Sequence, residues 1–219
     1  MIPSARAALR EAQLYGILDL GYVRSDQAFD LAAKSLAGGV QVLQLRAKDQ
    51  PREETLFLAR GLAQLCRQWR VPFILNDHPE LVLESEADGA HVGQDDTSVA
   101  EARTLAGKHA LIGKSTHSLA QALAAQEEKP DYIGFGPLFA TPTKPDYAPI
   151  GLHDIRAVHQ LVTLPIFCIG GIKRENLPDV IAAGTRRVVI VSGILQATDP
   201  QAYCEDCRHI LAQAGVLER

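Results

Sequence analysis

The stretch PIFCIGGIKRENLPDVIAAGTRRVVIVSGI, residues 165–194, contains two short apolar runs on either side of a helical pattern. Residues 165–169 and 187–191 are rich in β-branched and other apolar side chains, which is typical of buried strands. Residues 174–183 between them have the apolar spacing of a helix. A strand, a helix and a second strand in this order predict one β-α-β unit of a parallel sheet.

The same alternation recurs along the chain, and counting it predicts the architecture. Strands are expected at residues 14–18, 40–45, 72–75, 89–92, 110–113, 132–135, 165–169 and 187–191. Helices are expected at residues 25–37, 52–69, 79–84, 98–106, 119–128, 154–161, 174–183 and 200–214, with an extra N-terminal helix near residues 4–11. Eight repeats favour a closed (β/α)8 TIM barrel over an open sheet, which more often has about five or six strands. We therefore expect a single α/β domain over residues 1–219.

The composition argues against several other classes of protein. The 219 residues include 22 lysines and arginines against 26 aspartates and glutamates, which gives a formal net charge of −4. A nucleic-acid-binding protein usually carries a basic excess, and a membrane span needs roughly 20 consecutive apolar residues, which this chain does not have. We expect a soluble cytoplasmic protein with small-molecule partners and neither nucleic acid nor membrane. A homo-oligomer is compatible with the sequence.

The cysteines fit this expectation, since a chain of this length buries a sufficient core without disulfides. Cys204 and Cys207 form a C-x-x-C pair, which would be half of a zinc site or a redox pair. No second pair or nearby histidine pair completes it, and the surrounding residues have a helical pattern. We favour reduced, structural thiols.

Polar residues at the carboxyl ends of the predicted strands form the candidate site, because a barrel carries its chemistry there. At the end of the second strand, alternation places Gln44, Arg46 and Lys48 on one side. Two cations and a carboxamide can hold a phosphate or pyrophosphate, Arg46 through its forked guanidinium and Lys48 as a point charge. A solvated loop with a surface ion pair is an equally good interpretation of these residues alone.

Carboxylates follow the third and fourth strands, where Asn76-Asp77 ends one strand and Asp95-Asp96 follows the other. Neighbouring carboxylates can share Mg²⁺, which uses one or two protein carboxylates together with waters and phosphate oxygens. We select Asp77 and Asp96, although the residue types leave Asp95 against Asp96 open. Aspartate is also a good helix cap, so we expect one of Asp95 and Asp96 to cap the next helix.

Small polar residues and glycines mark the remaining strand ends. Ser115 can donate to an anion, Ser118 suits the cap of the next helix, and His117 is either a base or structural. The loop at residues 134–151 carries two threonines and a lysine, which is typical of a lid or binding loop but also compatible with a plain linker. Glycines after the last two strands, including Gly171, predict a phosphate site.

Taken in order, seven segments resemble the thiamine phosphate synthase (thiamine-phosphate pyrophosphorylase) family. They are QLRAKD (44–49), ND (76–77), ADGAHVGQDD (87–96), GKSTHS (113–118), DYIGFGPLFATPTK (131–144), PIFCIGGI (165–172) and VVIVSGI (188–194). Each segment alone is weak, but the ordered set covers nearly the whole barrel. The resemblance implies a transferase that joins 4-amino-2-methyl-5-hydroxymethylpyrimidine diphosphate to 4-methyl-5-(2-phosphoethyl)thiazole with Mg²⁺, and that releases pyrophosphate and thiamine phosphate.

The resemblance also implies a role for each matching residue. The residues that would hold the pyrimidine diphosphate are Gln44, Arg46, Lys48, Asn76, Ser115 and Lys144. Those that would face the thiazole phosphate are Thr141, Thr143, Gly171, Val191 and Ser192. Asp77 and Asp96 would bind Mg²⁺. The catalytic residues would be Arg46, Lys48, Lys144 and Ser115. Mg²⁺ together with Arg46, Lys48 and Lys144 would stabilise the departing pyrophosphate in a dissociative, carbocation-type displacement.

Three alternatives stay open at this point. A thiazole tautomerase of the same superfamily would use His117 as its base and would not need the diphosphate and metal residues together. Another phosphate-handling barrel isomerase or synthase would have a glutamate or lysine base at a strand end. A non-catalytic barrel that senses a thiamine precursor would bind ligand without releasing pyrophosphate.

Overall fold

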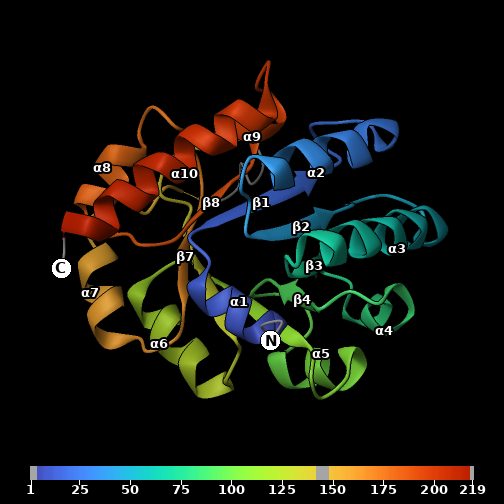
Figure 1. The fold of residues 1–219 in the computed structure, drawn as a ribbon. Helices are drawn as coiled ribbons and strands as arrows, with labels where there is room; N and C mark the ends of the chain where they lie inside the picture. Colours follow the sequence, from blue (N-terminus) through green and yellow to red (C-terminus); the bar gives the residue numbers. More distant parts are fainter. Residues whose placement is uncertain (1–3, 142–147, 218–219) are drawn as a thin grey trace.

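The fold is a closed barrel of eight parallel strands surrounded by helices (Figure 1). The computed structural model describes residues 4–141 and 148–217. Neighbouring strands pair in chain order, and β8 pairs with β1 to close the barrel. The strands are β1 (Leu14–Asp19), β2 (Val42–Arg46), β3 (Phe73–Asn76), β4 (Gly89–Val92), β5 (Leu111–Thr116), β6 (Tyr132–Phe135), β7 (Ile166–Cys168) and β8 (Val188–Ile190). The predicted (β/α)8 architecture is confirmed.

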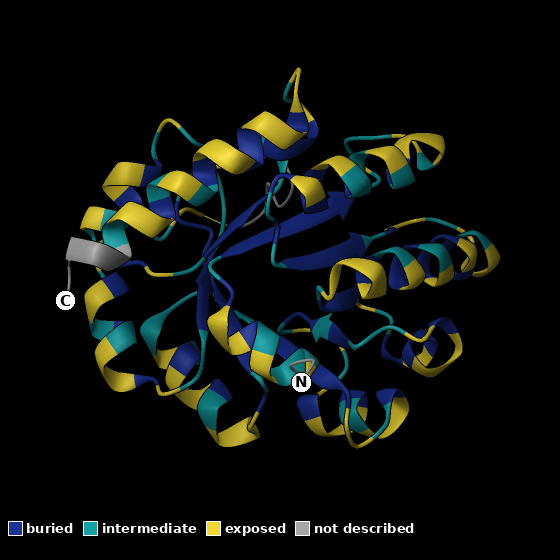
Figure 2. Ribbon diagram, viewed as in Figure 1, coloured by how far each residue is buried: buried dark blue, intermediate teal, exposed yellow. Residues whose placement is uncertain are grey.

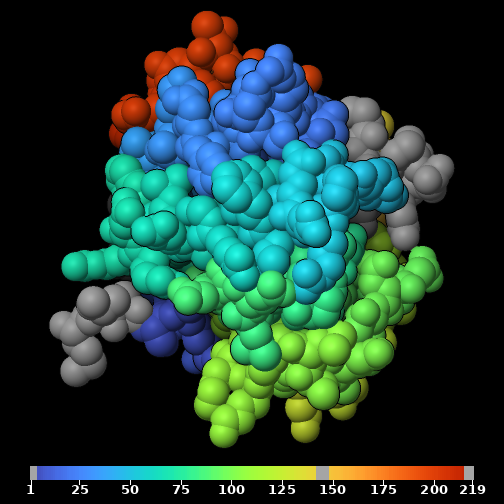
Figure 3. Space-filling view, turned by 90° about the vertical axis from the view of Figure 1, so that its right-hand side faces the viewer, coloured from blue at the N-terminus to red at the C-terminus, as the bar shows by residue number. Residues whose placement is uncertain are grey.

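The helices pack around the barrel with one face inward and one face toward solvent (Figure 2). They are α1 (Ala5–Glu11), α2 (Ala28–Ala37), α3 (Arg52–Trp69), α4 (Val82–Ser85), α5 (Val99–Ala106), α6 (Leu119–Glu128), α7 (Ile155–Leu161), α8 (Leu177–Ala182), α9 (Ser192–Leu195) and α10 (Pro200–Leu217), with 3-10 turns η1 (Ser25–Gln27) and η2 (Pro79–Leu81). Successive units are neighbours in space, since blue, cyan, teal and green segments follow one another down one face in Figure 3 and α2 contacts α3.

Several element boundaries differ from the sequence prediction. Residues 25–37 and 79–84 were each expected as one helix, but each begins as a 3-10 turn. The strand expected at 110–113 continues to Thr116, because Ser115 and Thr116 pair with Gly134 and Phe135 of β6. Helix α8 begins at Leu177 rather than at residue 174, and the four-residue helix α9 was not predicted.

The core has two parts, one inside the barrel and one between the strands and the helices. Tyr15, Val42, Leu111 and Phe167 belong to the inner part, where each side chain is at most 1 % exposed. The outer part is larger and consists mainly of aliphatic side chains from the outer faces of the strands and the inner faces of the helices. Because both faces of each strand are covered, the strands read as continuous apolar runs in the sequence.

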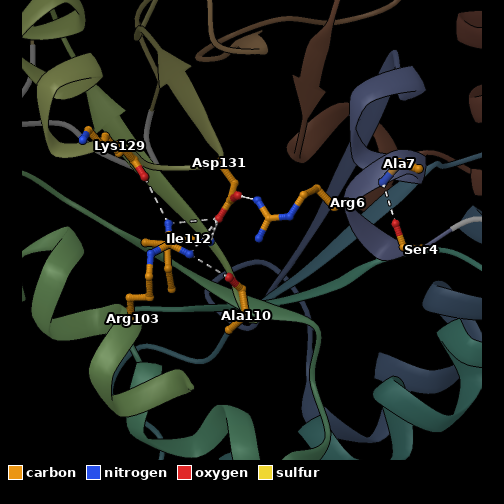
Figure 4. Close-up of polar contacts among 8 residues, drawn as sticks. All are labelled: Ser4, Arg6, Ala7, Arg103, Ala110, Ile112, Lys129 and Asp131. Carbon is orange, nitrogen blue, oxygen red and sulfur yellow. Dashed lines mark hydrogen bonds and ion pairs between the residues drawn. The ribbon is translucent and has the colours of Figure 1, made fainter. Parts of the chain in front are cut away.

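Helix α1 lies at the N-terminal end of the barrel, opposite the strand ends that were expected to carry the site (Figure 1). Ser4 caps it by accepting from the backbone N–H of Ala7 at 3.3 Å. Its buried residue Leu9 packs into the inner part of the core. An ion pair between Arg6 and the buried Asp131 ties it to the barrel (Figure 4). The extra N-terminal helix therefore covers the N-terminal end of the barrel.

Asp131 is the centre of this anchor. Its Oδ2 accepts from the backbone N–H of Ile112 at 2.8 Å and from both terminal nitrogens of Arg103 at 3.2 Å (Figure 4). Only 5 % of its side chain is exposed, so two arginines and an amide compensate the burial of its charge.

Within the described residues, no helix combines the length and the apolar character that crossing a membrane requires.

Candidate active site

A cavity opens at the carboxyl ends of the strands and reaches down into the barrel, with lining residues from all eight strands. Eight of the thirteen residues predicted for the site line it: Gln44, Arg46, Asn76, Ser115, Thr141, Gly171, Val191 and Ser192. Lys48, Asp77 and Asp96 are exposed and are not part of its wall. Thr143 and Lys144 lie outside the described residues.

Arg46 extends into the cavity from the end of β2, and Asp19 holds its guanidinium in place. Its Nη1 donates to Asp19 Oδ1 at 3.0 Å and to Oδ2 at 3.1 Å. The Asp19 side chain is 2 % exposed and that of Arg46 is 15 % exposed. A buried ion pair of this kind orients the guanidinium, so its remaining N–H groups are available to an anion in the cavity.

Two exposed carboxylates follow the carboxyl ends of β3 and β4. Asp77, directly after β3, has a backbone φ of +62°, a value that is uncommon for a non-glycine residue, and its Oδ2 accepts from Asn76 Nδ2 at 2.6 Å. Asp96 Oδ2 accepts from the backbone N–H of Gly93 at 2.8 Å. Within the described residues, no three His, Cys, Asp or Glu side chains gather into a metal site. A cation here would therefore take at most these two carboxylates and complete its shell from substrate and water.

The expectation that Asp95 or Asp96 caps the next helix is wrong. Helix α5 starts at Val99, and its N-cap is Ser98, whose Oγ accepts from the backbone N–H of Glu101 at 3.2 Å. Asp95 and Asp96 lie too early in the loop to serve that helix. The Asp96 side chain closes a turn within its own loop instead.

Close packing of two loops builds the other side of the mouth. Gly170 and Gly171 follow β7 with positive φ values of +98° and +65°. A side chain at Gly171 would overlap Phe139, so glycine is required both by the backbone conformation and by the neighbouring loop. Asn176 Nδ2 donates to the Gly171 carbonyl at 3.0 Å and fixes the turn.

At the end of β5, the structure distinguishes the residue that caps the next helix from the residues that line the cavity. Ser118 is the N-cap of α6, as predicted, and accepts from the backbone N–H of Gln121 at 3.2 Å. Ser115 and His117 line the cavity. The Nδ1 of His117 is 2.5 Å from the Gly136 carbonyl, so it donates there and ties β5 to the loop after β6.

The floor of the cavity contains polar residues that sequence reasoning missed. Tyr15 and Tyr132 are each 1 % exposed and join through their hydroxyls at 2.9 Å. His91 Nδ1 is 3.1 Å from the Tyr132 hydroxyl, and His91 Nε2 is 3.0 Å from Ser115 Oγ. Burial raises the pKa of both tyrosines, so they remain protonated phenols. The sequence feature that could have identified these residues is a tyrosine or histidine inside an otherwise apolar strand.

Cys204 and Cys207 lie in an environment typical of structural thiols, the interpretation that the sequence favoured. Both thiols are fully buried on α10, and burial raises the pKa of each to about 12. A thiolate is the form that binds metal or attacks a disulfide, so neither function suits this pair.

The fold and the cavity are typical of one class, the (β/α)8 enzymes that handle phosphorylated small molecules. An arginine, amides, hydroxyls and glycine turns line the cavity. The thiamine monophosphate synthase family matches residues 14–194. Since that span covers most of the chain, the protein belongs to this family. It is an enzyme, a transferase of thiamine biosynthesis with thiamine-phosphate synthase function, as the ordered motifs predicted.

Individual relatives agree with this assignment. A thiamine-phosphate synthase of Thermus thermophilus is 45% identical over 188 residues, 85% of this chain and 90% of the relative. One from Chloroflexus aurantiacus is 41% identical over 201 residues, 91% of this chain and 93% of the relative. The structure of a thiamine phosphate pyrophosphorylase from Pyrococcus furiosus superimposes with a TM-score of 0.86 at 29% identity, and covers 96% of this chain and 99% of its own.

Proposed function

We propose that the enzyme condenses 4-amino-2-methyl-5-hydroxymethylpyrimidine diphosphate with 4-methyl-5-(2-phosphoethyl)thiazole to give thiamine phosphate and pyrophosphate, with Mg²⁺. The observation that carries the proposal is the convergence of Gln44, Arg46, Asn76 and Ser115 on one cavity whose opposite wall holds Ser192. Polar groups on β2, β3 and β5 suit a diphosphate, and the turns after β7 and β8 suit a second phosphate.

The pyrimidine ring fits the lower part of this cavity. Ile17 and Phe167 provide apolar walls there, and Gln44 supplies a carboxamide at the floor. A planar, uncharged ring with an amino group buries apolar area against such walls while hydrogen bonding to an amide. We propose that the ring lies below the diphosphate, with its reacting methylene carbon between the two phosphate regions.

Charge stabilisation at the leaving pyrophosphate drives the proposed chemistry. An aminopyrimidine supports positive charge on its exocyclic methylene, so the carbon–oxygen bond breaks before the thiazole nitrogen forms the new bond. Arg46, already oriented by Asp19, meets the negative charge that develops on the leaving oxygen. Lys48 and Lys144 are proposed to add charge to the same group, and Ser115 to add a hydrogen bond.

The carboxylates that follow β3 and β4 fit Mg²⁺. Asp77 and Asp96 are exposed carboxylates on adjacent loops, and two carboxylates plus phosphate oxygens and water are the ligand set this ion favours. When bound, Mg²⁺ would supply positive charge that offsets the negative charge of the pyrophosphate.

The second phosphate is proposed to lie against the loops after β6, β7 and β8. Thr141, Gly171, Val191 and Ser192 line that part of the cavity, and Thr143 is proposed to join them. Binding there would hold the thiazole nitrogen near the methylene carbon, so that the second step becomes a reaction between groups already in place.

The test is turnover with both substrates. Purified protein is incubated with the pyrimidine diphosphate, the thiazole phosphate and Mg²⁺, and thiamine phosphate is detected by mass spectrometry with pyrophosphate measured separately. Metal-dependent formation of both products supports the proposal. Binding of either substrate without release of pyrophosphate contradicts it and favours a sensor, and conversion of a thiazole alone favours a tautomerase.

A further inference from the structure

A continuous chain of hydrogen bonds crosses the floor of the cavity and joins two residues proposed to contact substrate. Gln44 Nε2 donates to the Tyr15 hydroxyl at 2.8 Å. The Tyr15 and Tyr132 hydroxyls are 2.9 Å apart, and Tyr132 is 3.1 Å from His91 Nδ1. His91 Nε2 is then 3.0 Å from Ser115 Oγ. The chain runs from β2 through β1, β6 and β4 to β5.

The direction of donation along this chain follows from its first member. An amide nitrogen only donates, so the Tyr15 oxygen accepts from Gln44. The single proton of Tyr15 then goes to Tyr132, because with the opposite direction a fully buried O–H would lack a partner within the chain. The proton of Tyr132 in turn goes to His91 Nδ1.

This direction of donation assigns the proton of His91 to Nε2. With Nδ1 accepting from Tyr132, the Nε2–H group donates to Ser115 Oγ. The Ser115 oxygen then accepts from His91, so the Ser115 O–H group does not donate to His91. Since Ser115 lines the cavity, that proton is available to a ligand bound there.

The surrounding residues hold the chain in place. The Tyr15 and Tyr132 rings both contact Phe167 edge to face, with centroids 5.3 and 5.6 Å apart. A methyl group at Gly113 would overlap both His91 Nδ1 and the Tyr132 hydroxyl, so this glycine leaves the space in which they meet. Rigid packing of this kind favours one arrangement of protons over several.

We propose that Tyr132, supported by Tyr15, is a positioning residue that fixes His91 in its Nε2–H form. The Ser115 hydroxyl, which accepts from His91, then donates a hydrogen bond to an anionic oxygen of the bound diphosphate. The last step rests on the proposed function. The hydrogen-bond chain does not rest on the proposed function, because it is present in the protein without substrate.

The first experiment reads the histidine directly in the free protein. ¹⁵N-histidine-labelled full-length enzyme is examined by NMR, with the His91 signals identified by their absence from His91→Gln. Wild type is expected to show a protonated Nε2 and an unprotonated Nδ1. Tyr15→Phe should keep this form, because Tyr132 still donates, whereas Tyr132→Phe should shift both nitrogens toward a mixture of forms. A protonated Nδ1 in wild type, or an unchanged His91 in Tyr132→Phe, overturns the proposal.

The second experiment asks whether Tyr132 acts through Ser115. Tyr132→Phe is expected to lower kcat about tenfold, the scale of one hydrogen bond, with little change in the KM for the thiazole phosphate. In a Ser115→Ala background the same substitution should have almost no further effect, because the hydroxyl that it orients is absent. Equal losses in both backgrounds mean a structural role and overturn the proposal.

The controls separate this proposal from other causes. Ser35→Ala removes a buried hydroxyl that donates to the Leu31 carbonyl within α2 and does not line the cavity, and it should leave kcat unchanged. Absence of turnover in wild type contradicts the proposed function alone, because the NMR result for His91 is obtained without substrate.

Discussion

Asp19 and Arg46 are direct neighbours in the register of β1 and β2, and their side chains form an ion pair at 3.0 Å. Asp19 also accepts from the backbone N–H of Gly21 at 2.9 Å, so its carboxylate is held on two sides. The strand register thus fixes the position of a guanidinium that the sequence shows only as a charged residue at a strand end. Asp19 itself does not line the cavity.

Asp19→Asn is therefore expected to impair catalysis without removing any group that contacts substrate. The amide keeps the shape but loses the charge that orients Arg46, so kcat should fall roughly ten- to a hundredfold, as for a hydrogen bond between charged groups. Steady-state kinetics with the thiazole phosphate varied should show a KM close to that of wild type. Asp30→Asn, which breaks an exposed ion pair to Lys34, is the control and should behave as wild type.

Gly113→Ala is expected to destabilise the protein. Its methyl group would overlap Tyr132 and His91, and the strands on either side leave little room for a shift, so the free energy of unfolding should fall by about 1 to 3 kcal/mol. Gly134→Ala in the next strand is the matched substitution, since its methyl group would lie at ordinary contact distance, 3.5 Å, from His91. Denaturant unfolding should rank Gly113→Ala clearly below Gly134→Ala, and equal stabilities would contradict the steric argument.

The predictions from sequence succeeded where local pattern decides structure. Helices at 52–69 and 119–128 have the predicted bounds because amphipathic spacing and caps are local properties. Helix α8 starts late because Asn176 turns back to bond the Lys173 backbone and the Gly171 carbonyl, which needs the loop after β7 in place. The end of β5 likewise depends on pairing with β6.

The same distinction applies to the site. Strand-end residues such as Arg46 and Ser115 could be predicted because a barrel gathers strand ends at one mouth. The tyrosine chain could not, because Tyr15 and Tyr132 are 117 residues apart and meet only when the barrel has closed. Periodicity shows that a side chain faces inward, but it does not show which distant side chain it meets.

The cysteines should be unreactive in the folded protein. All four are buried, and burial raises the pKa of Cys168 to about 11 and those of Cys204 and Cys207 to about 12, while that of Cys66 also rises. At pH 8 the thiolate fraction of groups with such pKa values is on the order of one in a thousand or less. A disulfide reagent at pH 8 should therefore titrate almost no thiol in native protein and all four in denaturant. Rapid reaction of two thiols in native protein would instead indicate a redox role for the C-x-x-C pair.

Leu9→Ala tests whether α1 is an integral part of the barrel. Leu9 is 1 % exposed and fills the N-terminal end of the inner core, so truncation leaves a cavity among residues that the strands hold rigidly. The free energy of unfolding should fall by about 2 to 5 kcal/mol. Leu161→Ala on α7 removes the same atoms from a side chain that is 54 % exposed, and it should cost much less. If denaturant unfolding gave the two variants similar stabilities, α1 would be a peripheral helix, and the ion pair of Arg6 with Asp131 would only tether it to the barrel.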